Sequence, residues 1–471
     1  MSIISAPDTT FSGVRIDGGL APFQIVQQDA DGVGAIAVRG RWRHAEGRGV
    51  VQLRAVREAD GVVVAPWQPA SRQEGATWEH RFDQVPAGGL YRLETRLLVD
   101  PAGAEWSPHG DTVHHWGVGD LWIIAGQSNA AGYGRGPVVD PPELGVHILR
   151  NDEIWDIAAH PLNDATRSMH PNLEQANPGH SPYLRFAKEL KAALGYPIGL
   201  IQTALGGSAL TAWNLADNPE APLYRNLLHC VLLAGGRARG MVWYQGESDC
   251  NAAGAATYER RFADFVRRMR SDLGSPTLPV IVAQLNRYME AADAEANRAW
   301  SVVREAQWRA VRLGHVAVVS TLDLPLSDGI HTSPDGNLTL GSRKARAALA
   351  CAYGRQPANW QAPDVAEAML TPDRTAIELT FAHVANRLMF LGPGESDFVV
   401  EDADGAVPVQ AATCPARDRV RLELGRLPRG EVYVHGAFGA NPPANLRDAE
   451  ENTPMLGFYG LSVRLADPPG E

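Results

Sequence analysis

The chain has 471 residues, of which 45% are apolar and 21% are charged, and its formal net charge is −11 at pH 7. A length of this order predicts about three domains, each with a substantial hydrophobic core. The negative charge is spread along the chain, so we expect no nucleic-acid partner, which would require clustered Lys and Arg. No apolar run reaches about 18 residues, which excludes a membrane-spanning helix, and we expect no membrane partner.

The cysteines and the first residues bear on the compartment of the protein. Four cysteines are widely separated along the chain: Cys230, Cys250, Cys351 and Cys414. Their spacing fits neither a zinc site nor a redox pair, and we interpret them as free, buried thiols rather than as two disulfides. The opening sequence MSIISAPDTTF lacks the charged segment and apolar core of a signal peptide. The localisation stays open between the cytoplasm and export with a signal that the sequence does not include.

Residues 1–117 are predicted to form a β-sandwich-like module. Short runs with partial alternation of apolar and polar residues are separated by Gly, Pro and Asp, and no helical period is present. The expected strands cover 33–42, 50–57, 78–85 and 90–99. A small sandwich of two sheets fits this pattern.

From residue 118 to 356 the pattern changes to strands that alternate with long amphipathic segments. The expected strands are 121–125, 198–203, 241–244, 279–283 and 316–320. The expected helices are 181–195, 255–274 and 294–314, and a last helix follows Ser333 and Pro334. Ser181 is expected to cap the first of these helices, with Gly195 at its end. Such alternation predicts an α/β domain with a parallel sheet covered on both faces.

Residues 357–471 return to a β pattern and predict a second, C-terminal β-sandwich-like module. Its candidate strands are AIELTFA, RLMFLG, DFVVED, RVRLEL, EVYVHGAF and GLSVRL. No internal repeat and no low-complexity tract interrupts the three regions.

The residues suited to hydrolysis follow the predicted strands of the central region. Ligands bind beyond the carboxyl ends of the strands in an open parallel sheet. Ser128 follows the first strand in the stretch LWIIAGQSNAAGYG, on a turn that leads into a helix. Such a turn exposes the hydroxyl and leaves backbone N–H groups free for negative charge. Ser128 is therefore the candidate nucleophile, and a helix-capping serine is the alternative.

His331 and Asp328 follow the last strand and are the candidate base and its partner. A serine hydroxyl needs a base to act as a nucleophile. Asp328 lies three residues before His331, so its carboxylate can accept the second ring N–H and stabilise the imidazolium. The alternative is a turn aspartate beside a surface histidine.

Acyl transfer also needs hydrogen-bond donors for the oxyanion that develops on the carbonyl. The candidate donors are the N–H groups of Ser128, Gly206 and Gly207 and the side-chain amide of Gln245. Asn129 and Glu247 are expected to support the site. For Glu247 we favour a position that supports Gln245 or His331, with a helix cap as the alternative. Trp213 is a candidate sugar-stacking platform, with core packing as its alternative. His160, His170 and His180 are spaced by ten residues, which we interpret as coincidence, and we expect neither a metal nor an organic cofactor.

These residues resemble the signature blocks of the SGNH (GDSL-like) hydrolases, in particular the branch named for sialate O-acetylesterases. The blocks are Gly126-Gln127-Ser128-Asn129, Gly206-Gly207-Ser208, Gln245-Gly246-Glu247-Ser248 and Asp328-Gly329-Ile330-His331. The resemblance covers the central region and, more loosely, the final β-module. It implies a three-layer α/β/α flavodoxin-like core. In many members of the family an asparagine takes the place of Gln245 as the last oxyanion donor.

The resemblance also implies a serine esterase that removes O-acetyl groups from a carbohydrate. Ser128 would be the nucleophile, His331 the general base and Asp328 its partner. The substrate would be sialic acid or an acetylated plant or bacterial polysaccharide, and the oligomeric state stays open. Two alternatives are a carbohydrate-binding protein with an inactive esterase core and an esterase for lipid acyl chains. The small residues after Ser128 favour a short acyl group over a lipid.

Overall fold

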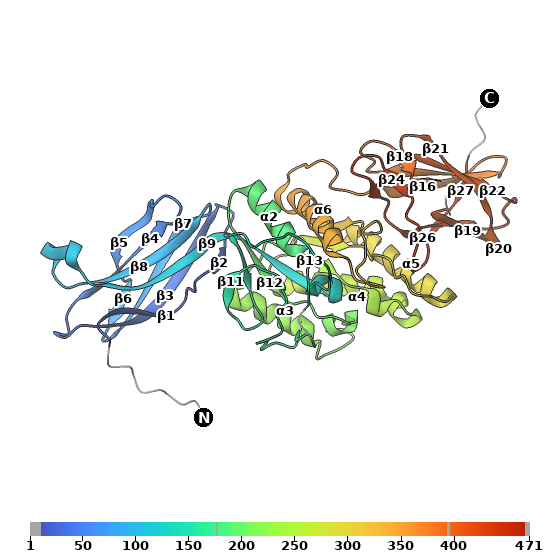
Figure 1. The fold of residues 1–471 in the computed structure, drawn as a ribbon. Coiled ribbons are helices and arrows are strands. Elements are labelled where there is room, and N and C mark those ends of the chain that lie inside the picture. Colours follow the sequence, from blue (N-terminus) through green and yellow to red (C-terminus); the bar gives the residue numbers. More distant parts are fainter. Residues whose placement is uncertain (1–10, 176–177, 393–395, 467–471) are drawn as a thin grey trace.

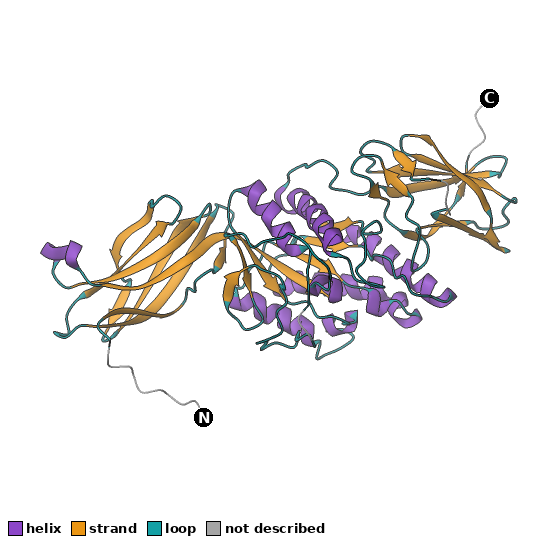
Figure 2. Cartoon of the chain, viewed as in Figure 1, coloured by secondary structure: helices purple, strands orange, loops and turns teal. Residues whose placement is uncertain are grey.

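The computed structural model describes residues 11–175, 178–392 and 396–466. The chain forms three parts in sequence order, with a β-rich part at each end and an α/β part between them (Figure 1). The long helices lie in the central part (Figure 2). The first ten residues, for which the sequence predicts no signal peptide, lie outside the described residues.

The N-terminal part consists of two antiparallel layers. One sheet has the order β1 (Gly13–Gly18), β3 (Val33–Arg43), β7 (Thr77–Pro86) and β6 (Arg72–Glu74). The other contains β5 (Val63–Pro69), β4 (Val50–Arg57), β8 (Leu90–Leu98) and β9 (His109–Gly126). Side chains alternate between a buried and a more exposed face along β3 and β7. The buried faces meet in a core that includes Ile36, Val38, Leu53, Leu93 and Trp116.

Strand β9 belongs to both the N-terminal part and the central sheet. Its first half pairs antiparallel with β8, as in the register of Gly117 with Leu90. At its start in the central sheet it pairs with the short strand β2 (Ile25–Gln27). Its second half lies in the central sheet, where Ile123 pairs with Ile201. The predicted border between residues 117 and 118 falls inside this continuous strand, and the division into three domains remains our proposal.

The central sheet has the order β11-β10-β12-β9-β13-β14-β15, and its pairs are parallel except for the antiparallel pair of β10 and β11. The strands besides β9 are β10 (Val146–Leu149), β11 (Trp155–Ile157), β12 (Ile198–Gln202), β13 (Gly240–Tyr244), β14 (Val280–Ala283) and β15 (Val316–Val319). The five strands predicted for this region are confirmed, whereas β10 and β11 were not predicted. The inner strands are buried throughout, as expected for a sheet that is covered on both faces.

Helices cover both faces of this sheet and complete the expected three-layer core (Figure 1). On one face α2 (Tyr183–Leu194) packs against α6 (Pro334–Tyr353). On the other face lie α3 (Pro222–Leu233) and α4 (Ala252–Asp272), and α5 (Ala294–Arg309) packs against α4. Of the helices in the described residues, none is both long enough and apolar enough to cross a bilayer.

The helix caps agree with the sequence prediction at Ser333 and Gly195 and differ from it at Ser181. The Ser333 hydroxyl accepts the backbone N–H of Gly336, and Pro334 opens α6 as expected. The predicted cap at Ser181 is wrong by one residue, because α2 begins at Tyr183 after Pro182. The Ser181 hydroxyl is buried and has no hydrogen-bond partner among the described residues. Gly195 ends α2 in the left-handed conformation, as expected.

The C-terminal part is built from small sheets around its own apolar core. The largest has the order β21 (Val409–Ala416), β22 (Arg419–Leu424), β17 (Ala376–Ala382), β16 (Asp364–Leu370) and β27 (Arg464–Leu465). A second has the order β20 (Gly405–Val407), β19 (Phe398–Asp402), β23 (Tyr433–Gly436) and β26 (Phe458–Ser462). The third is formed by β18 (Leu388–Phe390), β24 (Leu446–Asp448) and β25 (Thr453–Pro454). Leu379, Leu422, Val434 and Leu446 are among the buried residues of this core.

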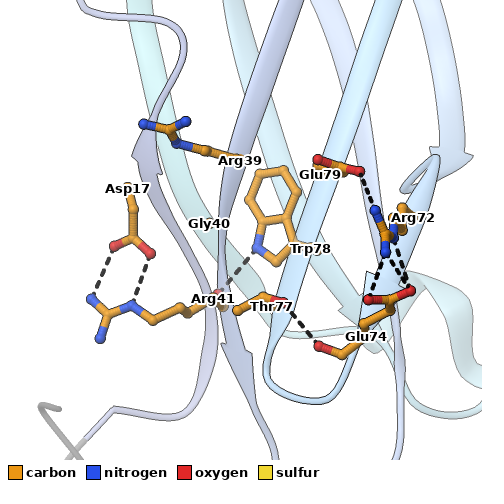
Figure 3. Close-up of a pocket in the computed structure, with 9 residues that line it drawn as sticks. All are labelled: Asp17, Arg39, Gly40, Arg41, Arg72, Glu74, Thr77, Trp78 and Glu79. Carbon is orange, nitrogen blue, oxygen red and sulfur yellow. Dashed lines mark hydrogen bonds and ion pairs between the residues drawn. The ribbon is translucent and has the colours of Figure 1, made fainter.

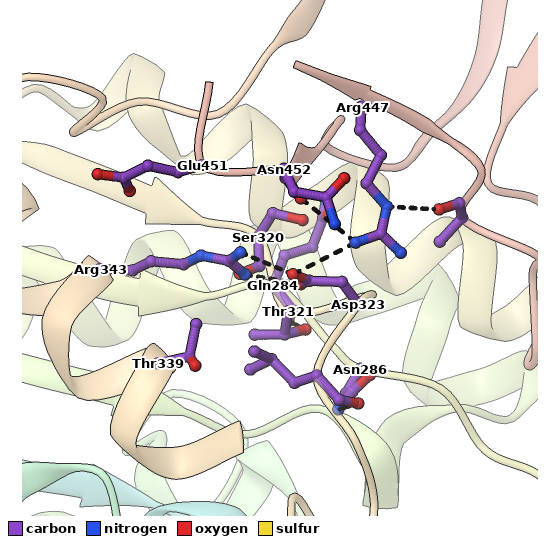
Figure 4. Close-up of polar contacts among 12 residues, drawn as sticks. Gln284, Asn286, Ser320, Thr321, Asp323, Thr339, Arg343, Arg447, Glu451 and Asn452 are labelled. Carbon is purple, nitrogen blue, oxygen red and sulfur yellow. Dashed lines mark hydrogen bonds and ion pairs between the residues drawn. The ribbon is translucent and has the colours of Figure 1, made fainter. Parts of the chain in front are cut away.

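Arginine side chains connect the C-terminal part to the central part. Asp323, in the loop after β15, accepts hydrogen bonds from the two terminal guanidinium nitrogens of Arg343, each at 2.7 Å (Figure 4). Arg447, from β24, approaches the same carboxylate to 3.5 Å. Arg304, on α5, is fully buried and donates to the backbone carbonyls of Gly439 and Ala440. The same loop between β15 and α6 carries Asp328 and His331. The C-terminal part therefore supports this loop at Asp323.

All four cysteines are free, as the sequence predicts. Cys230 is buried, and the other three are partly buried. Burial raises the pKa of each thiol above its ordinary value. The thiols are therefore neutral side chains that pack like small apolar residues.

Candidate active site

The turn after β9 presents Ser128 at the carboxyl end of the central sheet. Gly126 has a φ of +131°, and a Cβ atom there would lie 2.1 Å from the Tyr244 carbonyl oxygen, so only glycine fits. The backbone N–H of Gln127 donates to that same carbonyl at 2.9 Å. Ser128 then opens the short helix α1 (Ser128–Ala131). The sequence between β9 and α1 thus places the Ser128 hydroxyl and N–H beyond the strand end.

His331 and Asp328 form a hydrogen-bonded pair in the loop before α6. The Nδ1 atom of His331 lies 2.7 Å from Asp328 Oδ2, while Asp328 Oδ1 accepts the backbone N–H groups of Ile330 and His331. Partial burial opposes ionisation of Asp328, but these hydrogen bonds hold the pKa of its carboxyl below the ordinary value. An ionised Asp328 accepts the Nδ1 proton of His331, which leaves Nε2 as the basic nitrogen.

Ser128 and His331 line one surface pocket of about 380 Å³. The remaining lining residues come from the loops after β9, β12, β13 and β15: Gln127, Tyr133, Gly206, Gly207, Glu247, Ser248 and Ile330. These loops follow strands that are distant in the sequence but lie in one sheet, where β12, β9 and β13 are neighbours and β15 is separated from β13 by β14. Four of the predicted segments therefore meet at one place, at the carboxyl edge expected for a ligand site.

The two glycines after β12 differ in what their N–H groups contact. The Gly206 N–H donates to Glu174 Oε1 at 2.7 Å and is engaged within the protein. For the N–H groups of Gly207 and Ser128, no protein acceptor is present within the described residues. Gly207 also has a φ of +68°, a conformation that favours glycine. Gly207, rather than Gly206, is therefore the glycine whose N–H is available to a ligand.

Gln245 does not reach the pocket, which corrects its prediction as an oxyanion donor. Its side chain is fully buried, and Nε2 faces three protein acceptors. These are Asp249 Oδ2 at 2.6 Å, the Ser208 carbonyl at 3.1 Å and Gln127 Oε1 at 3.3 Å. An amide has two N–H groups, so no donor remains for a ligand. Gln245 instead ties the ends of β9, β12 and β13 together.

Asn129 connects the Ser128 turn to two other loops. Its Nδ2 donates to Glu247 Oε1 at 2.8 Å and to the Ile330 carbonyl at 3.2 Å, and its Oδ1 accepts the Thr332 N–H at 2.9 Å. Asn129 thus fixes the position of the loop that carries His331 relative to Ser128. Burial raises the pKa of Glu247, and its Oε2 has no partner among the described residues. Within these residues Glu247 is hydrogen-bonded to Asn129 rather than to Gln245 or His331.

Tyr133 lines the pocket and Glu174 holds it in place, and neither residue is predicted from the sequence. The Tyr133 ring stacks on the His331 imidazole, and its hydroxyl donates to Glu174 Oε2 at 2.7 Å. Glu174 Oε1 accepts the Gly206 N–H and, at 3.3 Å, the Asn163 amide. Burial raises the pKa of Glu174 above its ordinary value. Tyr133 could have been suspected from its place five residues after Ser128, but Glu174 lies in a long loop without a recognisable pattern.

Trp213 is a core residue, which corrects its prediction as a sugar-stacking platform. Its side chain has no exposed surface. The ring packs edge-on against Trp243 and Phe265, and its Nε1 donates to the Ser208 hydroxyl at 3.3 Å. A ring without exposed surface cannot stack on a sugar, so the alternative of core packing holds.

The N-terminal part has a pocket of similar size, about 400 Å³, with a different chemistry (Figure 3). Most of its charged side chains pair with one another: Arg41 with Asp17, and Arg72 with Glu74 and Glu79. Its lining has no Ser, Cys or His among the described residues. It therefore lacks the nucleophile and base that the pocket at Ser128 has. In the described residues, the groups of His, Cys, Asp and Glu that are close enough to share a metal ion lie outside both pockets.

Comparison with known proteins identifies the central region. Residues 118–350 match the family model described as "Carbohydrate esterase, sialic acid-specific acetylesterase". A probable carbohydrate esterase of Arabidopsis thaliana is 30% identical over 255 residues, which are 49% of this chain and 90% of that protein. Human sialate O-acetylesterase is 24% identical over 216 residues, which are 37% of this chain and 39% of that protein.

A solved structure resembles the whole fold. The alignment with the crystal structure of a carbohydrate acetylesterase from Xanthomonas citri covers 94% of this chain and 99% of the other chain, with a TM-score of 0.67. The sequence identity is 23%. At this identity the likeness establishes the fold, and it extends over the flanking β-rich parts as well as the central α/β core.

Proposed function

The chain belongs to a family of carbohydrate esterases, and we propose that it removes O-acetyl groups from a sugar through an acyl-enzyme on Ser128. The observation that carries this mechanism is the His331–Asp328 pair, joined at 2.7 Å, in the loop that lines one pocket with Ser128. Carbohydrate O-acetylesterase activity itself follows from the family. The identities of the nucleophile, the base and the substrate are the proposal.

In the first half-reaction the Ser128 oxygen attacks the carbonyl carbon of the acetyl group. His331 Nε2 takes the hydroxyl proton, while Asp328 holds the ring through Nδ1 and stabilises the imidazolium. The negative charge on the carbonyl oxygen is stabilised by the N–H groups of Ser128 and Gly207, which have no acceptor within the described part of the protein. The C–O bond to the sugar then breaks, and His331 returns the proton to the departing sugar oxygen.

In the second half-reaction water replaces the sugar. His331 removes a proton from the water, and the resulting hydroxide attacks the acetyl-Ser128 carbonyl. Collapse of the second tetrahedral intermediate releases acetate, and the proton on His331 returns to the Ser128 oxygen. The same base, held by Asp328, and the same two N–H donors serve both halves.

For the substrate we propose a neutral acetylated sugar, as in an acetylated polysaccharide. Neither lysine nor arginine is present among the described residues that line the pocket. The carboxylate of sialic acid favours a cationic partner. The cation Arg135 is exposed outside this lining, with its guanidinium 5.9 Å from the Tyr133 ring centre. A sialic acid would therefore need Arg135 as its partner, whereas a neutral sugar needs no such contact.

The proposal is tested by acetate release from acetylated xylan and from O-acetylated sialic acid, with the wild-type chain and with Ser128→Ala. We expect the variant to lose roughly four to six orders of magnitude in kcat, because serine and base act as a unit. Ser271→Ala, at an exposed position on α4, is the matched control and should match the wild type. Equal rates for the wild type and Ser128→Ala would overturn the nucleophile assignment. If the wild type releases acetate from neither glycan, the carbohydrate-binding alternative is favoured.

A further inference from the structure

Three potential metal ligands converge on the surface of the central part, away from the pocket at Ser128. They are Glu153, in the turn between β10 and β11, His170, in the loop after β11, and His229, on α3. Each offers one ligand atom, and these atoms all lie within 4.8 Å of one another. The residues come from three segments that are far apart in the sequence, so local sequence does not account for their meeting.

The two distances from the Glu153 carboxylate to the histidines fit a tetrahedral ion. His229 Nε2 lies 3.2 Å and His170 Nε2 lies 3.6 Å from the same carboxylate oxygen, Glu153 Oε1. Ligands about 2.0–2.1 Å from a tetrahedral zinc ion are separated by about 3.3 Å. We propose that Glu153, His170 and His229 bind a divalent transition-metal ion such as Zn²⁺, with water as the fourth ligand.

A buried asparagine network holds the three segments together directly beside these ligands. Asn172 donates to Asn151 Oδ1 at 2.9 Å, and Asn226 donates to Asn172 Oδ1 at 3.2 Å. All three asparagines are buried. Each lies within three residues of one of the ligands Glu153, His170 and His229. The backbone positions of the ligands are therefore fixed by hydrogen bonds that are independent of any ion, as a preorganised site requires.

The electrostatic setting also suits a cation. Within the described residues the ion-pair partners of Glu153 are these two histidines, and no Lys or Arg neutralises its carboxylate. The His229 side chain is 50% exposed, which leaves access for the ion and for water.

A second group, Asp140, His160 and His180, has similar spacing but a different charge balance. Both histidine Nε2 atoms lie 3.1 Å from Asp140 Oδ2. Lys188 Nζ, however, lies 2.7 Å from the other oxygen of the same carboxylate. The ammonium group already supplies the positive charge that Asp140 requires. This contrast favours Glu153, His170 and His229 as the metal site.

The ion would restrain the loop whose Glu174 holds Tyr133 and Gly206, two residues that line the pocket at Ser128. His170 lies four residues before Glu174, which accepts the hydroxyl of Tyr133 and the N–H of Gly206. A metal bound to His170 would join this loop to α3 and to the β10–β11 turn. The site therefore goes beyond the esterase mechanism, and it does not depend on the assignment of Ser128 as the nucleophile.

The test is a calorimetric titration of the tag-free, chelator-treated full chain with ZnCl₂. We expect one Zn²⁺ per chain and an affinity at least about tenfold lower in His229→Ala and in Glu153→Gln, since each variant keeps only two ligands. Ser128→Ala and His109→Ala should bind as the wild type does; His109 is exposed in the N-terminal part. Hydrogen exchange of residues 163–174 should slow with Zn²⁺ in the wild type and not in His229→Ala.

Each contrary result has a definite meaning. A wild-type chain that takes up no zinc, or a His229→Ala variant that binds it as well as the wild type, would overturn the site. Loss of binding in His160→Ala with retention in His229→Ala would place the ion at Asp140 and overturn it equally. Unchanged exchange of residues 163–174 on zinc binding would overturn the restraint on the loop. Since Ser128→Ala is expected to bind zinc normally, failure of the zinc site and failure of the esterase mechanism are distinguishable.

Discussion

The Tyr133 ring stacks on the His331 imidazole, with ring centroids 4.9 Å apart and ring planes at 26°. The hydroxyl at the far end of the tyrosine is held by Glu174 at 2.7 Å. The candidate base is thus fixed from two sides, by Asp328 through Nδ1 and by an anchored aromatic ring across its face. Tyr133 therefore makes two contacts that can be removed separately: the contact of its ring with His331 and the hydrogen bond of its hydroxyl to Glu174.

Tyr133→Phe and Tyr133→Ala should therefore differ in activity. The phenylalanine variant keeps the ring on His331 and loses one hydrogen bond, so we expect kcat/KM to fall by less than about tenfold. The alanine variant removes the ring and lets the imidazole move, so we expect a loss of roughly a hundredfold, mainly in kcat. Steady-state kinetics on an acetylated substrate measures both. Equal losses in the two variants would show that the hydrogen bond, and not the ring, positions His331.

Glu174→Gln should weaken both stability and catalysis although the change is isosteric. The carboxylate accepts hydrogens from Tyr133, Gly206 and Asn163, and an amide in its place offers one acceptor oxygen and one donor group. We expect the free energy of unfolding to fall by about 1–3 kcal/mol. Urea unfolding checks the stability, and kcat should fall in the same variant because the Gly206-Gly207 turn loses its anchor.

Glu220→Gln, at an exposed position before α3, is the control for this substitution. Loss of one exposed carboxylate there should change neither the unfolding midpoint nor kcat. A Glu174→Gln variant that behaves like this control would mean that the carboxylate has no role in holding the pocket wall.

The sequence predicts the central sheet well because buried parallel strands are continuous apolar runs. Residues 121–125 and 241–244 lie in β9 and β13, and the polar residues after them reach one pocket. Strands β10 and β11 are short, and no such run marks them. The meeting of Ser128 with His331 follows from the rule that parallel strands end at one edge. That part of the site depends on topology alone.

The details that the sequence misses depend on side-chain direction. Gln245 and Ser248 are three residues apart, yet the first is buried against Asp249 and the second lines the pocket. Glu174 and His170 lie in a loop without periodicity, so no pattern indicates that one reaches Tyr133 and the other His229. The ten-residue spacing of His160, His170 and His180 also hides their different partners. Contacts of this kind are determined by packing of distant segments.

The lowered pKa of Asp328 predicts how stability changes in acid. A carboxyl whose pKa is lower in the folded than in the unfolded state stabilises the fold above its unfolded pKa, about 3.9. That contribution is lost as the pH falls through the lower, folded-state pKa. Between pH 6 and pH 3, the free energy of unfolding of the wild type should therefore fall more than that of Asp328→Asn. Urea unfolding at a series of pH values measures the difference.

Asp31→Asn, at an exposed turn of the N-terminal part, provides the comparison for Asp328→Asn. Its pH dependence should follow the wild type, since the His331 contact is intact. Because the Asp328 side chain is 48% exposed, solvent screens its contribution and the effect is modest. Identical acid profiles for the wild type and Asp328→Asn would contradict the ionised pair with His331.

Substitutions of Trp213 should affect stability and leave sugar binding unchanged. The indole is fully buried against Trp243 and Phe265, so Trp213→Ala should cost about 3–5 kcal/mol of unfolding free energy. Trp213→Phe fills most of the same space and should remain folded, which permits a kinetic measurement. A residue that stacked on the sugar would raise KM when its ring is made smaller. A core residue would lower the unfolding midpoint and leave KM for the acetylated glycan unchanged. We expect the second result for Trp213→Phe, and a severalfold rise in KM with an unchanged midpoint would restore the role of a sugar platform.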